Sequence, residues 1–431
     1  MSSTASSAWF ALCDGNNFYV SCERLFQPAL RGRPVGVLSN NDGCVVARSD
    51  ELKALGVAMG TPAHTLRTLV RQHDITLLSS NYALYGDLSA RMMTVLGQFT
   101  PRLEVYSIDE AFLDLSGIGP DPLAYARQIR TTVQAWTGIP VSIGLAPTKT
   151  LAKVANKLAK QQGCGVLALP DEPAQTAALA DLAVEDLWGI SKRWGQKLRA
   201  RGITTALQLR EADPVPLRQA FSVVLARLVL ELRGISCLAL ETVNPPKKQI
   251  RASRSFGRRL TALTDIQPLL AAHVTRAAET LRRQGSITQG LLVFLHTNPF
   301  REQDAQYRNS VYLPLPVASQ DTRVLLRVAM AGLARIYQPG FRYHKTGVML
   351  LDLLPAHQRQ GNLFEAEERE QAARLMATVD AINARLGRGT VRFARQGFTS
   401  SPGVLRVGRK TPAYTTRWDQ LPRVKAGLPA V

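Results

Sequence analysis

The stretch from Leu103 to Leu115 constrains the fold most, because apolar and more polar side chains alternate along it around two adjacent carboxylates. A period of two is typical of a strand pair with one buried face. Asp109 and Glu110 can share a target only if the chain turns, since consecutive residues on a flat strand point to opposite faces. We therefore expect a tight hairpin near Ser107-Ile108. Such a pair forms either half of a two-metal site or a solvated acidic turn.

The positive charge of the chain is concentrated in one segment. The 431 residues carry a net charge of +20, to which residues 242–360 contribute +11 and residues 171–241 contribute 0. A concentrated surplus is typical of a module that binds a polyanion, so we expect nucleic acid as a partner. With 45% hydrophobic residues, a chain of this length is expected to form about three globular domains.

The cysteines and the N-terminal residues predict a cytoplasmic protein. The five cysteines are odd in number and include no Cys-x-x-Cys pair, which argues against a disulfide framework and against a zinc site. The apolar run from Trp9 to Cys13 is too short for a signal peptide or a membrane span. We expect reduced thiols and no association with a membrane.

The first part of the chain has the pattern of a mixed α/β sheet. An apolar run from Ala8 leads into Asp14-Gly15, which makes Asp14 a candidate third carboxylate at a sheet edge. Helices are expected at 81–99, 125–136 and 147–160, and a strand at 141–146. The third of these helices places four lysines on one face: Lys149, Lys153, Lys157 and Lys160.

Residues 31–80 have the pattern of a small insertion with short strands. Arg48 and Lys53 lie in this insertion, and either could neutralise a phosphate. Lone basic side chains on a helix face are also commonly solvated, and the sequence leaves both readings open.

Residues 171–241 are helical in pattern. Gly189 and Gly195 lie between apolar residues that anchor helices on either side of a short turn. This arrangement indicates a helix-hairpin-helix, in which backbone N–H groups bind a DNA phosphate without reading bases. An ordinary connection between two helices has the same pattern.

A stiff polar break at 244–248 precedes the most basic part of the chain. Helices expected at 266–284 and 322–336, with strands near 290–295, 310–315 and 345–351, predict a second α+β domain. Beyond Pro355 we expect a linker, a charged helix at 366–386 and a tail. The break and the start of the domain carry six basic residues: Lys247, Lys248, Arg251, Arg254, Arg258 and Arg259.

Four motifs occur in a fixed order, namely Asp14-Gly-Asn-Asn-Phe-Tyr19, Tyr106-Ser-Ile-Asp-Glu-Ala-Phe112, Gly144-Leu-Ala-Pro-Thr-Lys-Thr-Leu-Ala-Lys153 and Trp188-Gly-Ile190. Together they resemble the Y-family translesion DNA polymerases. The chain is most similar to the bacterial UmuC branch, the catalytic subunit of DNA polymerase V and its plasmid-borne relatives. The resemblance extends from Phe10 to the C-terminal tail.

The resemblance implies a multidomain right-hand polymerase of α/β and α+β class. Its parts would be a mixed α/β palm at 8–30 and 77–170, small fingers at 31–76, a helix-hairpin-helix thumb at 171–241, a DNA-binding α+β little finger at 245–355, and a C-terminal linker, clamp-binding peptide and tail at 356–431.

The resemblance also implies the roles of individual residues. Asp14, Asp109 and Glu110, with the carbonyl of Gly15, would bind two Mg²⁺ ions for phosphoryl transfer. Tyr19 would exclude the 2′-hydroxyl of a ribonucleotide. Lys160 and the backbone amides of Asn17 and Phe18 would bind the triphosphate.

The insertion departs from the family pattern. Where much of the family has a Tyr and an Arg, this chain has Asp50 and Lys53. A lysine is a point charge that cannot clamp a phosphate bidentately, so we expect Lys53 to share the phosphate contact with Arg48.

By the same resemblance, the expected function is error-prone synthesis on damaged primer-template DNA from deoxynucleoside triphosphates, in DNA damage tolerance and SOS mutagenesis. The expected protein partners are a processed UmuD-type dimer, a RecA filament and the sliding clamp. The clamp would bind Gln360, Leu363 and Phe364, an apolar pair preceded by a Gln.

Two other functions fit parts of the sequence. A nucleotide cyclase uses acids on a similar sheet but needs no basic second domain. A non-catalytic DNA-binding accessory subunit would be expected to lack one of the three carboxylates, and all three are present.

Overall fold

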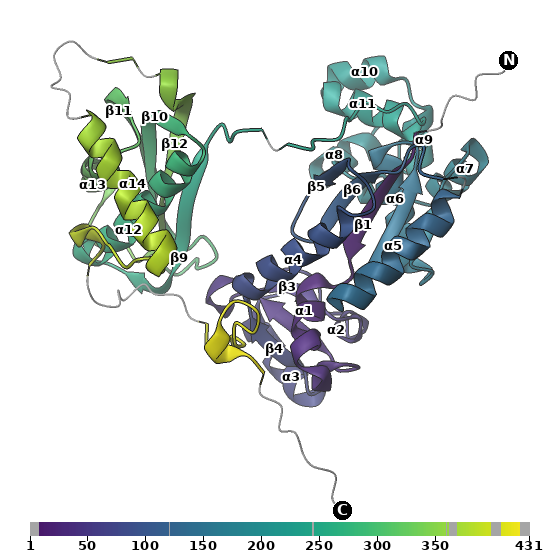
Figure 1. Cartoon of the computed structure of the whole chain (residues 1–431), viewed down its shortest axis with the longest axis horizontal. Helices are drawn as coiled ribbons and strands as arrows, with labels where there is room; N and C mark the ends of the chain where they lie inside the picture. Colours follow the sequence, from purple (N-terminus) through teal and green to yellow (C-terminus); the bar gives the residue numbers. More distant parts are fainter. Residues whose placement is uncertain are drawn as a thin grey trace, which may run out of the picture. The chain divides into compact units, whose positions relative to one another are not determined.

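The computed structural model describes residues 8–119, 121–243, 245–358, 360–361, 369–397 and 407–422 (Figure 1). The chain divides into two compact units. Unit 1 consists of residues 1–39, 43–244 and 409–431, and unit 2 consists of residues 40–42 and 245–408.

Unit 1 is built on a five-stranded sheet in the order β5-β6-β1-β7-β8. The strands are β1 (Phe10–Gly15), β5 (Leu103–Val105), β6 (Glu110–Asp114), β7 (Val141–Ala146) and β8 (Val166–Ala168). β1 is central and pairs antiparallel with both β6 and β7. The hairpin expected in 103–115 is confirmed, because β5 and β6 pair antiparallel and the chain turns between them.

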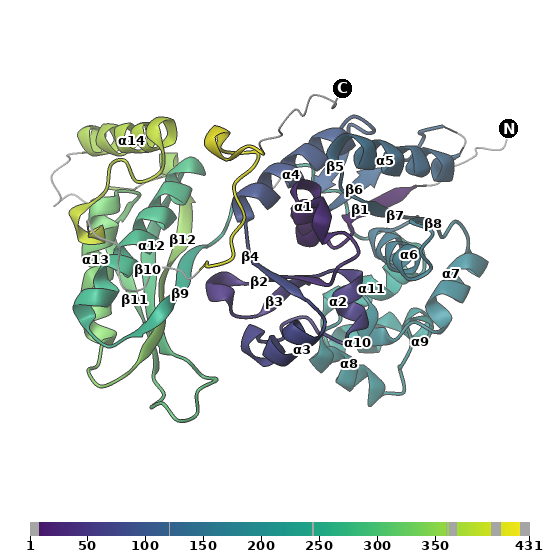
Figure 2. The same ribbon diagram turned by 90° about the horizontal axis from the view of Figure 1, so that it is seen from below.

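Alternate side chains of β1 belong to two different cores. Ala11 and Cys13 pack in a core with α1 (Phe18–Phe26), α4 (Tyr82–Leu96) and α5 (Pro122–Thr137). Phe10 and Leu12 pack in the other core, with α6 (Lys149–Gln161). Figure 2 shows α5 and α6 on opposite sides of β7 and β8. The period of two thus gives a sheet covered by helices on both faces.

A smaller three-stranded sheet follows α1, in the order β3-β2-β4. It contains β2 (Val35–Leu38), β3 (Val45–Arg48) and β4 (Thr76–Ser79), with the short helices α2 (Asp50–Ala54) and α3 (Arg67–Gln72). This part has its own small core, which includes Leu38, Leu52 and Leu77.

Five short helices complete the core beside α6. They are α7 (Glu172–Ala180), α8 (Lys192–Arg199), α9 (Ala206–Glu211), α10 (Pro214–Ala220) and α11 (Val223–Leu232). Each begins after a residue whose side chain accepts a hydrogen bond from the first turn, namely Asp171, Ser191, Thr205, Asp213 and Ser222. Each such cap is worth about 1 kcal/mol, which matters for helices this short.

Unit 2 is a four-stranded antiparallel sheet in the order β11-β10-β12-β9. It consists of β9 (Ile250–Leu260), β10 (Ser286–Thr297), β11 (Arg308–Ser319) and β12 (Tyr343–Pro355), with α12 (Leu263–Arg283) and α13 (Thr322–Ile336) sharing its core. α14 (Arg369–Leu386) is attached by Asp380, which forms an ion pair with Arg282 of α12. The basic stretch from Arg251 is therefore a strand, which its sequence did not indicate.

No helix in the described parts of the chain combines the length and the apolar character needed to cross a membrane.

The contact between α6 and β7 yields a prediction about stability. A Cβ on Gly144 would lie 2.1 Å from the backbone N of Asn156 and 2.3 Å from the backbone O of Ala152. Backbone atoms cannot move aside cheaply, so we expect Gly144→Ala to destabilise unit 1 by about 3 kcal/mol or to prevent folding. Thermal and denaturant unfolding of the purified variant measure this.

Gly86→Ala is the matched control, because nothing lies within 4 Å of a Cβ at this position in α4. Replacing a glycine inside a helix should stabilise it by about 0.5–1 kcal/mol. If Gly144→Ala unfolds at the wild-type midpoint, α6 does not depend on this close approach.

Candidate active site

Asp14 and Glu110 face each other across the two central strands. They are partners in the antiparallel register of β1 and β6. Asp109 immediately precedes β6, and its carbonyl accepts a 2.8 Å hydrogen bond from the N–H of Gly15. The Ser107 hydroxyl donates to Asp109 Oδ1 at 2.7 Å and accepts from the N–H of Glu110 at 3.1 Å. The hairpin turn therefore gathers the three predicted carboxylates at one end of the sheet.

Gly15 has little room for a side chain. A Cβ there would lie 3.0 Å from Phe18 Cδ2 and 3.5 Å from Asp109 Cβ. A glycine at this position lets the turn after β1 lie close to Asp109.

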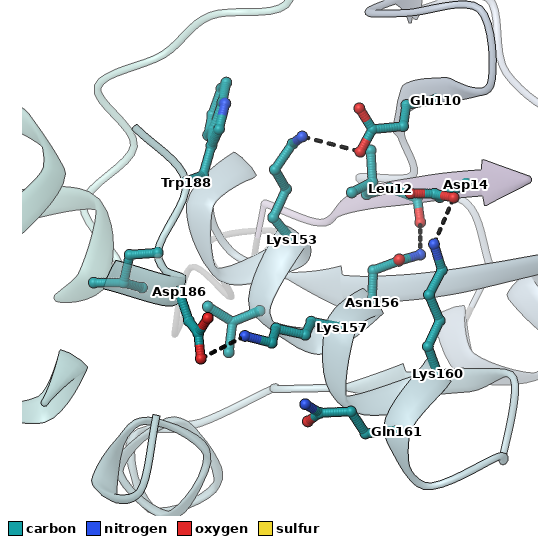
Figure 3. A pocket seen from close by; sticks show the side chains of 12 residues that line it. Leu12, Asp14, Glu110, Lys153, Asn156, Lys157, Lys160, Gln161, Asp186 and Trp188 are labelled. Atoms are coloured by element: carbon teal, nitrogen blue, oxygen red, sulfur yellow. Dashed lines mark hydrogen bonds and ion pairs between the residues drawn. The ribbon is translucent and has the colours of Figure 1, made fainter. Parts of the chain in front are cut away.

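Two lysines of α6 pair with these carboxylates. Lys160 Nζ lies 2.5 Å from Asp14 Oδ1, and Lys153 Nζ lies 3.0 Å from Glu110 Oε1 (Figure 3). One turn away, Lys157 Nζ lies 2.9 Å from Asp186 Oδ2. These groups line a cavity of about 390 Å³, together with Trp188. The fourth lysine of the predicted face, Lys149, is instead buried and pairs with Glu104.

The surroundings of Asp14 raise the pKa of its carboxyl group. Burial raises the pKa of the Asp14 carboxyl to about 6, the Lys160 ammonium opposes this rise, and the charges of Glu110 and Asp109 add to it. Negative groups that repel one another in a partly buried site favour a bound cation.

Within the described residues, no three acidic, histidine or cysteine side chains are arranged to hold a metal ion. Asp14 and Glu110 are paired with lysines in this structure. The donor set nevertheless fits Mg²⁺, because it consists of carboxylate oxygens and a backbone carbonyl, the ligands that hard cations prefer.

Lys153 lies among three aromatic rings. Its Nζ is 4.3 Å from the ring centre of Tyr106, 5.0 Å from that of Trp188 and 6.0 Å from that of Phe112. The indole N–H of Trp188 donates to the Tyr106 hydroxyl at 3.0 Å. Lys153 is not among the predicted site residues, although its place on the lysine face, between two aromatic motifs, is a usable signal.

The start of α1 brings together the residues predicted to contact the nucleotide. Asn17 precedes the helix in the left-handed backbone region at φ 47°. The Phe18 side chain is buried in the core. Tyr19 is half-buried and stacks on Tyr85, with ring centres 4.3 Å apart and planes 15° apart.

The structure separates the two basic residues of the insertion. Lys53 Nζ donates to Asn17 Oδ1 at 2.6 Å and pairs with Asp50 Oδ1 at 2.9 Å. Arg48 Nη1 instead donates to the carbonyl of Val57 at 2.7 Å. Only Lys53 of this pair therefore contacts the predicted nucleotide-binding turn, and the predicted sharing with Arg48 has no support in the geometry.

The two glycines of the predicted hairpin have different surroundings. Gly189 is exposed in the turn after Trp188 and adopts φ +88°, a conformation that favours glycine. Gly195 is buried inside α8, and its N–H donates to the carbonyl of Ser191 at 2.8 Å. The N–H of Gly195 is thus committed to the helix, whereas Gly189 lies in the exposed turn.

The predicted basic residues of unit 2 lie on and before β9. Lys247, Lys248, Arg251, Arg254 and Arg258 are exposed, and the Arg251 guanidinium lies 4.7 Å from the ring centre of Phe294. Arg259 donates to Asp304 Oδ2 at 2.7 Å, so its charge is offset within the unit.

Three basic groups on neighbouring strands were missed. His296 is the register partner of both Arg308 and Lys345. Burial and then the charge of Arg251 lower the pKa of Lys345, so the positive charge of Arg251 lies close enough to act on Lys345. Strand register brings them together, and no local pattern in the sequence reveals it.

A groove of about 520 Å³ runs along β9 and α12. Its basic lining residues include Lys247, Arg251, Arg254 and Arg276. Burial, with the charges of Arg254 and Arg276, lowers the pKa of His273 in this groove to about 4. His273 is therefore neutral at pH 7, and the arginines and the lysine supply the positive charge.

The predicted clamp-binding peptide is only partly described. Gln360 is exposed. Leu363 and Phe364 lie outside the described residues.

Family models match three parts of the chain. Residues 13–157 match the impB/mucB/samB family, and residues 247–363 match the impB/mucB/samB family C-terminal domain. Residues 373–424 match a domain of unknown function (DUF4113).

Curated relatives match over nearly the whole length. Protein UmuC of Salmonella typhimurium is 44% identical over 422 residues, covering 96% of this chain and 100% of that protein. Protein MucB of Escherichia coli is 41% identical, covering 96% and 99%. DNA polymerase IV of Moorella thermoacetica is 30% identical, covering 90% and 96%.

A solved chimera of the Y-family DNA polymerases Dbh and Dpo4 has the same fold. It matches with a TM-score of 0.65 at 21% identity, covering 80% of this chain and 99% of the chimera. Together with the family models and the relatives, this shows that the chain belongs to the impB/mucB/samB family, the UmuC-type branch of the Y-family DNA polymerases.

Proposed function

We propose that this DNA polymerase performs template-directed, error-prone translesion synthesis, adding deoxynucleotides to a primer 3′ end. The observation that carries the proposal is the pairing of Asp14 with Glu110 across β1 and β6, with Asp109 held beside them by Gly15. In this reading the five-stranded sheet is the palm, the three-stranded sheet the fingers, helices α7 to α11 the thumb, and the four-stranded sheet of unit 2 the little finger.

Asp14, Asp109, Glu110 and the Gly15 carbonyl would hold two Mg²⁺ ions, which supply charge stabilisation for the attacking and leaving oxygens in phosphoryl transfer. Lys160 would bind the triphosphate, since its ammonium already lies at the carboxylates. Lys153 pairs with Glu110 and lies against the ring of Trp188. It would thereby keep the Glu110 carboxylate oriented.

The start of α1 would bind the sugar and the phosphates. The ring of Tyr19 would pack under C2′ of the incoming nucleotide, supported from behind by Tyr85. The backbone amides of Asn17 and Phe18 would face the phosphates. Lys53 would add a positive charge beside Asn17.

The basic residues of unit 2 would bind the DNA backbone without reading sequence. Arg251, Arg308 and Lys345 come from three strands of one sheet, which makes an extended positive surface. His296 lies between Arg308 and Lys345 in the register, and burial with these neighbouring charges lowers its pKa, so it is neutral at pH 7. The exposed turn at Gly189 would contact a phosphate from the thumb side.

The setting of this synthesis follows from the similarity to UmuC. We propose that the polymerase acts in the cytoplasm in SOS mutagenesis, with a processed UmuD-type dimer, a RecA filament and the sliding clamp as partners. Gln360, Leu363 and Phe364 would bind the clamp.

Loss of a metal-binding carboxylate should abolish synthesis. We expect Asp109→Ala and Glu110→Ala each to lower the rate of primer extension by about 10³-fold or more, because transition-state charge is no longer stabilised. Primer-template binding, measured by fluorescence anisotropy, should stay near wild type. Asp181→Ala, at an exposed position at the end of α7, is the control. Extension at more than about a tenth of the wild-type rate in both variants would remove these residues from the site.

Tyr19→Ala should admit ribonucleotides, because a methyl group leaves space for a 2′-hydroxyl that a ring excludes. The ratio of kcat/KM for deoxy- and ribonucleotides should fall by about 10²-fold or more. Tyr19→Phe keeps the ring and should keep the ratio. A folded Tyr19→Ala protein with the wild-type ratio would show that another residue selects the sugar.

DNA affinity should fall steeply with salt through the unit 2 surface. Each phosphate contact removed should reduce the slope of log Kd against log salt by about one, so Arg251→Gln with Lys345→Gln should reduce it by about two. Arg327→Gln with Arg335→Gln makes the same charge change at exposed positions of α13 and should leave the slope unchanged. If the two double variants have the same salt slope, the DNA does not bind through Arg251 and Lys345.

A further inference from the structure

The segment Arg409–Leu421, here called the strap, packs on unit 1 beside β4 and α1 (Figure 1). Ser79 at the end of β4 donates its N–H to the carbonyl of Arg409 at 3.0 Å, and the N–H of Arg409 donates to the Ser79 hydroxyl at 3.0 Å. The ring of Tyr414 stacks on Phe26 of α1, with centres 4.6 Å apart and planes 7° apart. The strap therefore has a defined position on this unit.

The strap takes up the side chain that would ordinarily cap α4. Asn81 occupies the N-cap position of this helix but makes no side-chain capping bond. Its amide Nδ2 instead lies 3.0 Å from Thr411 Oγ1 and 3.0 Å from the carbonyl of Pro412. Asn81 is fully buried. The Asn81 side chain thus bonds to the strap and not to the free N–H groups in the first turn of α4.

Thr411 continues this connection to a buried carboxylate. Its hydroxyl accepts from Asn81 and donates to Glu23 Oε1 at 3.2 Å. The same oxygen accepts from the Tyr85 hydroxyl at 2.6 Å. Glu23 is fully buried, and burial raises the pKa of its carboxyl. A buried acceptor with so few donors depends strongly on each one.

The connection ends at the residue proposed to select the sugar. Tyr85 is fully buried, held at its hydroxyl by Glu23, and its ring stacks on Tyr19 at 4.3 Å. Glu23 and Tyr19 lie one turn apart on α1. The order of contacts is therefore Asn81, Thr411, Glu23, Tyr85 and Tyr19.

We propose that the strap, a segment of the same chain, positions the sugar-selecting ring of this polymerase. Thr411 acts through Glu23 and Tyr85 to fix the position of the Tyr19 ring. Thr411 is a positioning residue and touches no substrate. The proposal rests on the proposed role of Tyr19. It also gives a function to part of the matched domain of unknown function, residues 373–424.

The contacts favour this role over that of a simple stabilising clasp. Thr411 and Ala413 are the buried residues within the strap, and Tyr414 is its partly buried contact with the core of unit 1. Thr411 bonds to Asn81 and Glu23, and the N–H of Arg409 bonds to Ser79. Tyr414 also bonds to the side chain of Gln27, at the end of α1. Hydrogen bonds that lead through Glu23 to Tyr85 fix the position of the Tyr85 ring more than they add to the stability of unit 1.

The test compares two replacements of Thr411 in the full-length chain, with Mg²⁺, primer-template and the protein partners present. Thr411→Val keeps the shape and removes the hydroxyl, whereas Thr411→Ser keeps the hydroxyl. We expect Thr411→Val to lower the deoxy- to ribonucleotide ratio of kcat/KM by about tenfold, the equivalent of one hydrogen bond. Thr411→Ser should stay within about twofold of wild type. Thr416→Val, an exposed position in the strap, is the matched control.

A second variant approaches the same carboxylate from the other side. Tyr85→Phe keeps the ring that stacks on Tyr19 and removes the hydroxyl that binds Glu23. It should lower the ratio in the same direction as Thr411→Val, which keeps the proposal testable if Thr411→Val does not fold. Hydrogen exchange of the amides in the first turn of α4 should also rise in Thr411→Val and not in Thr411→Ser.

The outcomes separate this proposal from the assignment of Tyr19. If Tyr19→Ala loses sugar selection and the folded Thr411→Val and Tyr85→Phe proteins keep it, the strap proposal is wrong and the polymerase assignment stands. Equal losses in Thr411→Val and Thr411→Ser would also overturn it, since the hydroxyl is then not the contact that matters. Unchanged selection in Tyr19→Ala overturns the role of the ring and the strap proposal with it.

Discussion

The candidate site depends on the contact of one buried side chain, Asn156, with strands β1 and β7. Its amide Nδ2 donates to the carbonyl of Leu12 in β1 at 3.1 Å and to that of Ser142 in β7 at 2.7 Å. Gly144 gives the backbone of α6 room to approach. A shift of α6 would leave a buried amide unpaired at a cost of about 1–3 kcal/mol. Lys153 and Lys160 lie on the same side of α6 as Asn156, so their ammonium groups reach Glu110 and Asp14.

This placement explains how a partly buried acidic site is stable. Asp14 and Glu110 would repel each other across β1 and β6, and the lysines of α6 offset that charge. The aromatic rings around Lys153 reduce its access to water. Through Lys153, Glu110 is also connected to Trp188. A cation at the carboxylates would compete with these ammonium groups, so the lysines and a bound cation would offset the same negative charge.

Unit 2 reaches its positive surface by a different route. α12 and α13 share the core on one face of the sheet, so alternate residues of each strand point away from that core. Antiparallel register then brings Arg308, His296 and Lys345 side by side, although they are far apart in the sequence. Asp304 offsets the charge of Arg259 within the unit. A surface of this kind suits a backbone of phosphates more than a specific base sequence.

The sequence by itself determined the features that depend on near neighbours. The alternation in 103–115 predicted the hairpin, and the charge count placed the basic unit after residue 242. Periodicity also predicted α13 to the residue, at Thr322–Ile336. The three carboxylates could be named because each lies in a recognisable local motif.

Only the tertiary structure decided the partner of each polar group. Lys149 looks equivalent to Lys153 on the helix face, yet it is buried against Glu104. Arg48 binds the carbonyl of Val57, and Gly195 lies inside a helix. Thr411 reaches Glu23 across 388 residues of sequence. Secondary structure follows from patterns that repeat over a few residues, whereas these partners follow from packing between distant segments, which no local pattern records.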